Sequence, residues 1–271
     1  MKTIVITGAT GVLCREFALS LARDGHRIAL IARNEDKLNI LCEEIKSYGT
    51  DAVFCKADVT DEAEMKLAYN YISENLGKCD VLINGAGGNH PAANTSEEYY
   101  NPKTQDEFGS FFNLQREGFS KVFDLNLWGT VLPCRIFSKD MTDKSGCSII
   151  NISSMAAYSP LTKTPAYCAA KAGISNFTQW LAVHLAPANI RVNAIAPGFF
   201  LTEQNRHLLY SHDGSFSPRA DKIISGTPMR RFGDPKELIG ALKFLIDEEK
   251  SGFITGCVIP VDGGFSAYSG V

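Results

Sequence analysis

The sequence of 271 residues lacks any long hydrophobic run, and no stretch of about 18 consecutive apolar residues predicts a transmembrane helix. Over residues 1–8 it also lacks the basic and then apolar pattern of a secretory leader. Both absences argue against a membrane partner. We therefore expect a soluble, unexported, cytoplasmic protein.

A dominant charge of one sign is also absent. Against 27 Lys and Arg residues stand 30 Asp and Glu residues, which gives a formal net charge of -3. Nonspecific binding of nucleic acid usually requires a basic excess, so we do not expect that function. No Pro/Ser-rich or charge-rich linker divides the chain. The sequence therefore predicts a single domain over residues 1–271.

Cysteine is plentiful, with eight residues, but the patterns that give cysteines a role are missing. There is no Cys-x-x-Cys pair and no neighbouring His pair, so the spacing predicts neither a zinc site nor a disulfide framework. We expect no metal, and we expect most of these thiols to be small core residues of a reducing compartment.

Short runs rich in Val and Ile alternate with longer amphipathic stretches. The runs are apolar throughout, as in parallel strands that helices cover on both faces. The alternation predicts an α/β fold with a doubly wound sheet of about seven strands, at residues 3–6, 27–31, 52–55, 81–83, 148–152, 191–195 and 258–261. Two polar segments interrupt it, at 88–118 and 199–226, where we expect a substrate lid and a second substrate loop.

The glycine turn Thr-Gly-Ala-Thr-Gly-Val-Leu-Cys, at residues 7–14, follows the first run and opens a helix. In that position backbone N–H groups and the helix dipole can bind a phosphate. An ordinary strand-to-helix turn is the alternative, because the third glycine of such fingerprints is missing. We predict a dinucleotide site of the Rossmann type with these candidate contacts: Gly8, Thr10, Gly11, Val12 and Leu13.

The end of the second run bears on the choice between NAD and NADP. A carboxylate there would accept hydrogen bonds from the adenosine ribose of NAD, but the run ends Leu-Ile-Ala and is followed by Arg33. Arg33 either pairs with the 2′-phosphate of NADP or only begins a solvated turn. The residues alone therefore favour NADP slightly and leave NAD open.

The segment Asn-Ile-Ser-Ser that ends at Ser154, together with the Tyr-x-x-x-Lys motif of Tyr167 and Lys171, resembles the short-chain dehydrogenase/reductase family. The resemblance spans almost the whole chain and includes the turn at Gly8 and the Asn-Gly-Ala-Gly segment at 84–87. It implies an NAD(P)-dependent oxidoreductase that acts on CH–OH groups of a small molecule, assembled as a homotetramer or homodimer.

The chemistry of ketone reduction explains these residue types. The developing alkoxide needs a proton, and a phenol is a poor acid at its ordinary pKa of about 10. Lys171 lies four residues after Tyr167, on the same face of a helix, where its ammonium would lower the pKa of the phenol. We predict Tyr167 as the acid or base and Ser154 as a hydrogen-bond partner of the substrate oxygen. The resemblance implies that Asn126 holds a water that links Lys171 to solvent.

The resemblance also implies cofactor contacts at Asp58, Val59, Asn84, Gly85, Ala86, Tyr167, Lys171, Pro197, Gly198 and Thr202. Two residues depart from the family pattern. Cys14 stands where the last loop glycine is expected, and Gly85 replaces the second asparagine of Asn-Asn-Ala-Gly. Cys14 could loosen the packing of helix on strand or the affinity for the cofactor. Its thiol is either buried and inert or, near a helix N-terminus, unusually acidic.

Within the family, the segments 87–91, 196–206 and 262–271 resemble the D-mannonate oxidoreductase (fructuronate reductase) branch. The likeness implies interconversion of D-fructuronate and D-mannonate, and it favours NAD. A sugar acid needs cations and hydrogen-bond donors around it. Besides Ser154, the candidate substrate contacts are Asn89, His90, Lys163, Gln204 and Arg206, of which Lys163 is the first choice for the carboxylate.

Two other interpretations stay open. The same chemistry could serve gluconate, as in a gluconate 5-dehydrogenase, or another polyol or keto acid, because a fold does not fix its substrate. Alternatively, the departures at Cys14 and Gly85 fit a catalytically silent scaffold that only senses nucleotides. The complete set of Ser154, Tyr167 and Lys171 argues against the scaffold.

Overall fold

The computed structural model describes residues 1–142, 144–202, 206–211 and 213–270. Its sheet has seven parallel strands in the order β3-β2-β1-β4-β5-β6-β7, so the predicted doubly wound α/β fold is confirmed. Each predicted run forms a strand, with ends that differ by at most two residues: β1 Thr3–Thr7, β2 Arg27–Ala32, β3 Ala52–Lys56, β4 Val81–Asn84, β5 Ser148–Ile152, β6 Arg191–Pro197 and β7 Val258–Val261.

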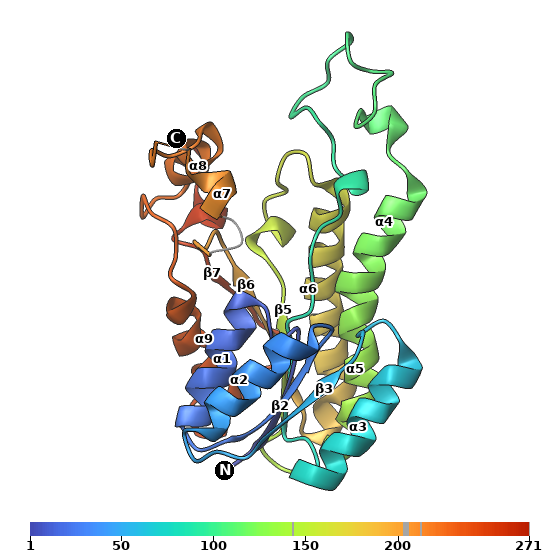
Figure 1. The fold of residues 1–271 in the computed structure, drawn as a ribbon, viewed down its shortest axis with the longest axis vertical. Helices are drawn as coiled ribbons and strands as arrows, with labels where there is room; N and C mark the ends of the chain where they lie inside the picture. The colour runs from blue at the N-terminus through green and yellow to red at the C-terminus, as the bar shows by residue number, and fades with distance from the viewer. Residues whose placement is uncertain (143, 203–205, 212, 271) are drawn as a thin grey trace.

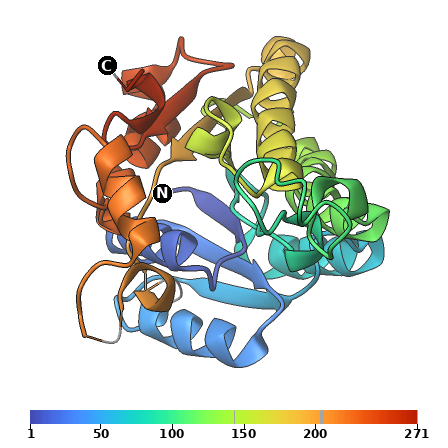
Figure 2. The ribbon, with the colours of Figure 1, turned by 90° about the horizontal axis from the view of Figure 1, so that it is seen from above.

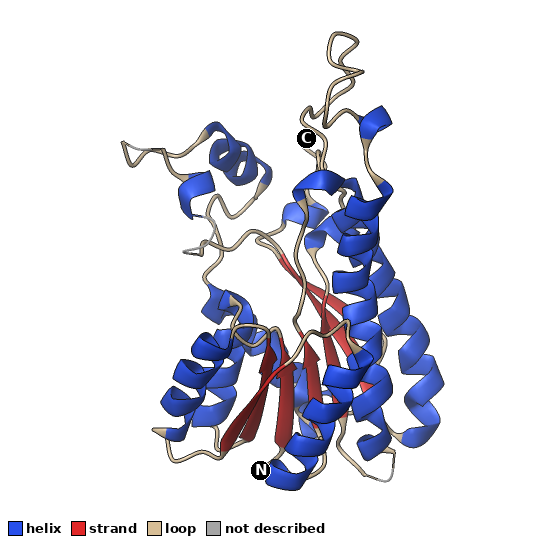
Figure 3. Cartoon of the chain, turned by 45° about the vertical axis from the view of Figure 1, so that its right-hand side comes forward, coloured by secondary structure: helices blue, strands red, loops and turns tan. Residues whose placement is uncertain are grey.

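Helices cover both faces of the sheet (Figure 3). Helices α1, α2 and α9 pack on one face, and α3, α5 and α6 pack on the other. In the described part of the chain, none of the helices is long and apolar enough to traverse a bilayer. Their bounds are α1 Val12–Arg23, α2 Glu35–Lys46, α3 Glu62–Leu76, α4 Arg116–Phe123, α5 Gly129–Phe137, α6 Pro165–Leu185, α7 Arg206–Leu209, α8 Pro218–Gly226, α9 Ile239–Ile246 and α10 Glu248–Ser251.

The apolar strands explain the two layers. Side chains of a strand alternate between the faces of its sheet. In β1, Ile4 and Ile6 therefore join the core under α1, α2 and α9, while Val5 joins the core under α3, α5 and α6. All three side chains are fully buried. A strand that is apolar at every position is thus what a sheet covered on both faces requires.

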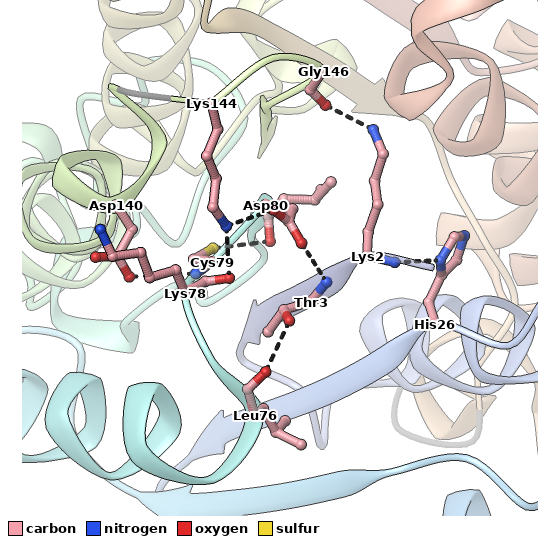
Figure 4. A network of polar contacts seen from close by, with 11 residues as sticks. Lys2, Thr3, His26, Leu76, Lys78, Cys79, Asp80, Asp140, Lys144 and Gly146 are labelled. Atoms are coloured by element: carbon pink, nitrogen blue, oxygen red, sulfur yellow. Dashed lines mark hydrogen bonds and ion pairs between the residues drawn. The ribbon is translucent and has the colours of Figure 1, made fainter.

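A polar network fixes the opposite end of the sheet, where the strands begin (Figure 4). The Asp80 carboxylate accepts a hydrogen bond from the backbone N–H of Thr3 at 2.7 Å and one from the Lys144 ammonium at 2.6 Å. Nearby, the Lys2 ammonium donates to the carbonyl of Gly146 at 2.6 Å. These contacts hold β1 beside the segments that lead into β4 and β5, and they leave the carboxyl ends of the strands free for function.

The sheet reverses its winding direction between β1 and β4, and in such sheets ligands bind at the carboxyl ends of the strands beside that point. Both polar segments rise above this edge (Figures 1 and 2). The first contains two short 3₁₀ turns, η1 Pro91–Ala93 and η2 Phe111–Asn113, and the second contains α7 and α8. Lys222 of α8 forms an ion pair with Glu98 of the first segment at 2.8 Å.

Candidate active site

Ser154 and Tyr167 meet where β5 ends and α6 begins. Ser154 follows β5 by two residues and caps the 3₁₀ turn η5 (Met155–Ala157), where its hydroxyl accepts a hydrogen bond from the N–H of Ala156 at 3.1 Å. Tyr167 lies in the first turn of α6, and its hydroxyl forms a hydrogen bond with Ser154. The two groups that are predicted to hold a substrate oxygen therefore contact each other.

Lys171 lies one helical turn after Tyr167 and is buried, with only 5% of its surface exposed. Its ammonium donates a hydrogen bond to the carbonyl of Ile152 at 2.9 Å and lies 5.7 Å from the centre of the Tyr167 ring. Burial disfavours the charged form and lowers the pKa of Lys171 to about 8. The ammonium is thus placed beside the phenol, as the helical spacing predicts.

The prediction that Lys171 lowers the pKa of Tyr167 is wrong for the protein on its own. Burial raises the pKa of Tyr167, and the hydrogen bond with Ser154 opposes that effect only in part. The pattern of residue types gives the neighbours of a phenol but not the desolvation around it. At neutral pH Tyr167 is therefore a neutral phenol, which is the form that donates a proton.

Asn126 lies in a π-helical turn, Asp124–Trp128, between α4 and α5. Its side chain is fully buried; the amide donates to the carbonyls of Gly88 at 2.7 Å and Val122 at 2.8 Å, and the oxygen accepts from the N–H of Gly88 at 3.2 Å. A π-helical turn within an α-helix often marks a functional position. Here it turns the Asn126 amide toward the strand ends.

The glycine turn forms a cradle suited to a phosphate. A Cβ atom on Gly8 would lie 2.7 Å from the backbone of Ala86, and Gly8 has a φ of +64°, so only glycine fits there. Gly11 caps α1 without a side-chain hydrogen bond to the open N–H groups, and the first turn of α1 carries no acidic residue. The positive end of the helix is thus left for an anionic ligand.

A single hollow begins at this cradle and follows the strand ends toward α2. Eight predicted cofactor contacts line it: Gly8, Thr10, Gly11, Arg33, Asp58, Val59, Gly85 and Ala86. Gly87 lines it too, together with residues that the sequence analysis missed: Ala32, Asn34, Lys37, Ala57 and Leu125. Ala32, Asn34 and Ala57 could have been predicted, because they are neighbours of Arg33 or Asp58 in the sequence. Leu125 could not, because only the fold brings it to the hollow.

Arg33 and Asp58, which both line the hollow, face each other with 4.0 Å between the guanidinium and the carboxylate. Burial acts to raise the pKa of Asp58, but hydrogen bonds from Thr60 and the charge of Arg33 outweigh it and lower the pKa. Asp58 is thus an anion with its side chain held by Thr60 at 2.7 Å and 2.9 Å. Arg33 stays mostly exposed and free to meet a ligand.

Other predicted cofactor contacts lie away from this hollow. Asn84 is buried in the core, where its amide donates to Asn151 at 2.9 Å and to the Cys134 sulfur at 3.1 Å, because its side chain points down from the strand end. Leu13 packs on the core, and Val12 lines a neighbouring groove. The last three lie at and after the end of β6 and do not line the hollow: Pro197, Gly198 and Thr202.

A family model described as short chain dehydrogenase matches residues 2–211. The chain belongs to the short-chain dehydrogenase/reductase family. An uncharacterized oxidoreductase of Bacillus subtilis, UxuB, is 51% identical over 270 residues, which cover 100% of this chain and 96% of that protein. A Haemophilus crystal structure with bound NAD, provisionally named a D-mannonate oxidoreductase, matches with a TM-score of 0.96 at 50% identity over 100% of this chain and 96% of that one.

More distant family members have also been solved with a cofactor. A Burkholderia cenocepacia gluconate 5-dehydrogenase, in complex with NADP and tartrate, matches with a TM-score of 0.82 at 26% identity and covers 98% of this chain and 96% of that one. Family membership makes this chain an oxidoreductase of alcohol groups that uses NAD or NADP. The geometry of the glycine turn fits such a dinucleotide.

The two departures from the family pattern contact each other. A Cβ atom on Gly85 would lie only 2.0 Å from the sulfur of Cys14, so the cysteine occupies the space that any side chain at position 85 would need. Burial raises the pKa of the Cys14 thiol to about 12. The acidic-thiol alternative is therefore wrong, and the pair gives no reason to regard this family member as a silent scaffold.

The predicted substrate contacts lie in three different segments of the chain. Asn89 and His90 build the first turn of the lid segment: the Asn89 amide donates to Asn94 at 2.8 Å, and the His90 imidazole accepts from the N–H of Ala92 at 3.2 Å. Arg206 is exposed on α7, with its guanidinium 5.0 Å from the centre of the Tyr210 ring. Gln204 lies outside the described residues.

Lys163 connects the lid segment to the catalytic segment. Its backbone has a φ of +68°, which is unusual for a residue other than glycine, and its carbonyl accepts a hydrogen bond from the N–H of Thr95 at 2.9 Å. A hydrogen bond from Lys222 lowers the pKa of Glu98, and the charges of Lys222, Lys163 and Arg219 add to that effect. Lys163 is thus one of three cations whose charges act on Glu98.

Proposed function

We propose that this enzyme reduces the ketone of a sugar acid and oxidises the corresponding alcohol, with D-fructuronate and D-mannonate as the pair. Lys163 carries the proposal. It lies on the segment between Ser154 and Tyr167, and its carbonyl accepts a hydrogen bond from the N–H of Thr95, so a cation stands on the segment that leads into α6, where it can pair with a substrate carboxylate. The name given to the Haemophilus protein, which is 50% identical, supports the same substrate.

The catalytic roles follow from the contacts. When bound, the nicotinamide supplies or accepts the hydride. The hydrogen-bonded hydroxyls of Ser154 and Tyr167 hold the substrate oxygen, and Tyr167 donates the proton to it. Lys171 and Asn126 return a proton to Tyr167 through water, and Lys171 also binds the nicotinamide ribose. A long acyl chain would offer no partner to the ammonium of Lys163, which argues against such a substrate.

A screen of substrates tests the function directly. The oxidation of NADH and of NADPH is followed with D-fructuronate, tagaturonate and 5-ketogluconate. We expect the highest kcat/KM with D-fructuronate. A higher value with 5-ketogluconate would support the gluconate-type alternative, and cofactor binding without turnover of any keto acid would support a silent scaffold. NADH is the expected partner because the Haemophilus structure holds NAD, although Lys37 beside Arg33 would also suit NADP.

Lys163→Gln is expected to raise the KM for the keto acid by about tenfold, because a lost charge-assisted hydrogen bond costs about 1.5–3 kcal/mol. The left-handed backbone at position 163 makes the same demand on glutamine as on lysine, so the fold should be kept. The affinity for NADH, measured by fluorescence, should not change. Lys139→Gln, on the far side of the molecule, is the control. An unchanged KM would exclude Lys163 as the carboxylate partner.

The remaining expectations about the molecule rest on the family resemblance. Assembly as a homotetramer or homodimer and a place in the cytoplasm stay predictions.

A further inference from the structure

The turn at residues 85–87 is enclosed on several sides, and neither Gly85 nor Gly87 has room for a side chain. Cys14 fills the space beside Gly85, and Gly8 lies against the backbone of Ala86. At the far end, a Cβ atom on Gly87 would lie 2.8 Å from the Asn126 side-chain oxygen and 3.1 Å from the Lys171 nitrogen. The turn therefore separates the glycine loop from the groups that serve proton transfer.

Hydrogen bonds fix the same turn from below. The Thr7 hydroxyl accepts from the N–H of Gly85 at 3.2 Å and from the N–H of Ala86 at 3.4 Å. Gly85 would also meet the Thr7 carbonyl, at 3.1 Å from its Cβ position. The turn cannot move toward Thr7 to make room, so a group added at Gly85 must push it toward the dinucleotide or toward Lys171.

The Cys14 sulfur has little freedom to move aside. Cys14 is only 3% exposed and belongs to the main core, and within α1 the helical backbone restricts its side-chain rotamers. Within Cys14 the obstacle is the sulfur, because the Cβ atom of Cys14 lies 3.7 Å from the Cβ position of Gly85, which is an ordinary contact. Alanine at position 14 would thus open the space without removing the helix.

We propose that Cys14 and Gly85 are an interlocked pair: the Cys14 sulfur fills the space beside position 85, and the absence of a side chain at Gly85 keeps the 85–87 turn in its place at the dinucleotide site. Cys14 is then a positioning residue, which acts on the ligand through the backbone of Gly85 and Ala86. The Cys14 side chain on α1 takes the volume that a side chain at position 85, just after β4, would need. The proposal concerns the dinucleotide alone and does not depend on the identity of the sugar acid.

A cycle of three variants tests the pair: Gly85→Ala, Cys14→Ala and both together. The dissociation constant for NADH is measured by fluorescence titration, and the melting temperature is measured without ligand. Gly85→Ala should weaken NADH binding about tenfold, because the added methyl group meets the Cys14 sulfur and must displace the turn. Cys14→Ala should weaken it less than about threefold. The double variant should bind at least about threefold more tightly than Gly85→Ala, although the Thr7 carbonyl prevents full recovery.

The ligand measurement separates positioning from stability. If Gly85→Ala lowers the melting temperature but leaves the NADH dissociation constant unchanged, the pair is merely structural and the proposal is overturned. It is also overturned if the double variant binds as weakly as Gly85→Ala alone. Should Gly85→Ala fail to fold, a folded double variant with strong NADH binding supports the pair, and failure of both variants overturns it. Gly240→Ala, whose Cβ meets no atom within 4 Å, is the control.

Discussion

Tyr167→Phe is expected to lower kcat for keto-acid reduction by about 10³-fold, because it removes the hydroxyl that donates the proton and leaves the ring in place. The dissociation constant for NADH should stay within about twofold, since the phenyl ring keeps the shape of the site. Both quantities are measured on the wild type and the variant with the same keto acid, at pH 7.

Tyr158→Phe is the matched control for that experiment. Tyr158 follows Ser154 by four residues, and its hydroxyl donates to the carbonyl of Val258 at 3.0 Å, outside the proposed proton path. Its loss should change kcat by less than about threefold. A Tyr167→Phe enzyme with near-normal turnover would remove Tyr167 from the role of acid, whatever the substrate.

Lys171→Met is expected to lower kcat by at least about 10²-fold and, at pH 7, to raise the stability of the ligand-free protein. Folding lowers the pKa of Lys171 from 10.5 to about 8. At pH 7 the folded protein therefore buries a charged amine, at a cost of about 3 kcal/mol. The Ile152 carbonyl loses its partner in the variant, which offsets about 1–3 kcal/mol. We expect a net gain of about 1 kcal/mol.

The dependence on pH is the sharper part of this prediction. Below pH 8, Lys171 is protonated in both the folded and the unfolded state, and the full cost of burying its charge destabilises the folded wild type. Between pH 8 and 10.5 the folded state loses its proton first, so the wild type gains stability relative to Lys171→Met as the pH rises. Urea unfolding at pH 7 and pH 10 measures the difference.

Lys144→Met provides a control of opposite sign, because it breaks the ion pair with Asp80 and should destabilise the protein at both pH values. A constant difference in stability between wild type and Lys171→Met from pH 7 to pH 10 would mean that the buried amine carries no penalty. The interpretation of Lys171 as a cation that is buried at a cost in stability would then be wrong.

The sequence was sufficient for the strands and for most of the cofactor hollow. The reason is physical: buried parallel strands must be apolar at every position, and a backbone that touches a phosphate must be glycine, so both leave a local pattern. Residues such as Gly8 and Asp58 could be found because their roles depend on the turn that contains them. Tyr167 and Lys171 lie on one helix at a fixed spacing, so their contact was equally predictable.

Other features depend on contacts between distant segments. Cys14 and Gly85 each looked like a defect in a motif, because their separation of 71 residues along the chain hides that they share one space. The direction of the Asn84 side chain depends on its neighbours Cys134 and Asn151. The pKa of Tyr167 depends on how much water the surrounding segments exclude, which no spacing records.

The π-helical turn at Asn126 has a consequence for the evolution of this chain. A residue removed from an α-helix rotates everything after it by about 100°. A π-helical turn instead absorbs one extra residue locally, so deletion of one residue at Asp124–Trp128 would restore a regular helix and leave Leu132 and Phe137 of α5 in the core they fill. What such a deletion would remove is the bulge that carries Asn126. The extra residue in this stretch thus serves the position of one side chain and not the packing of the helix.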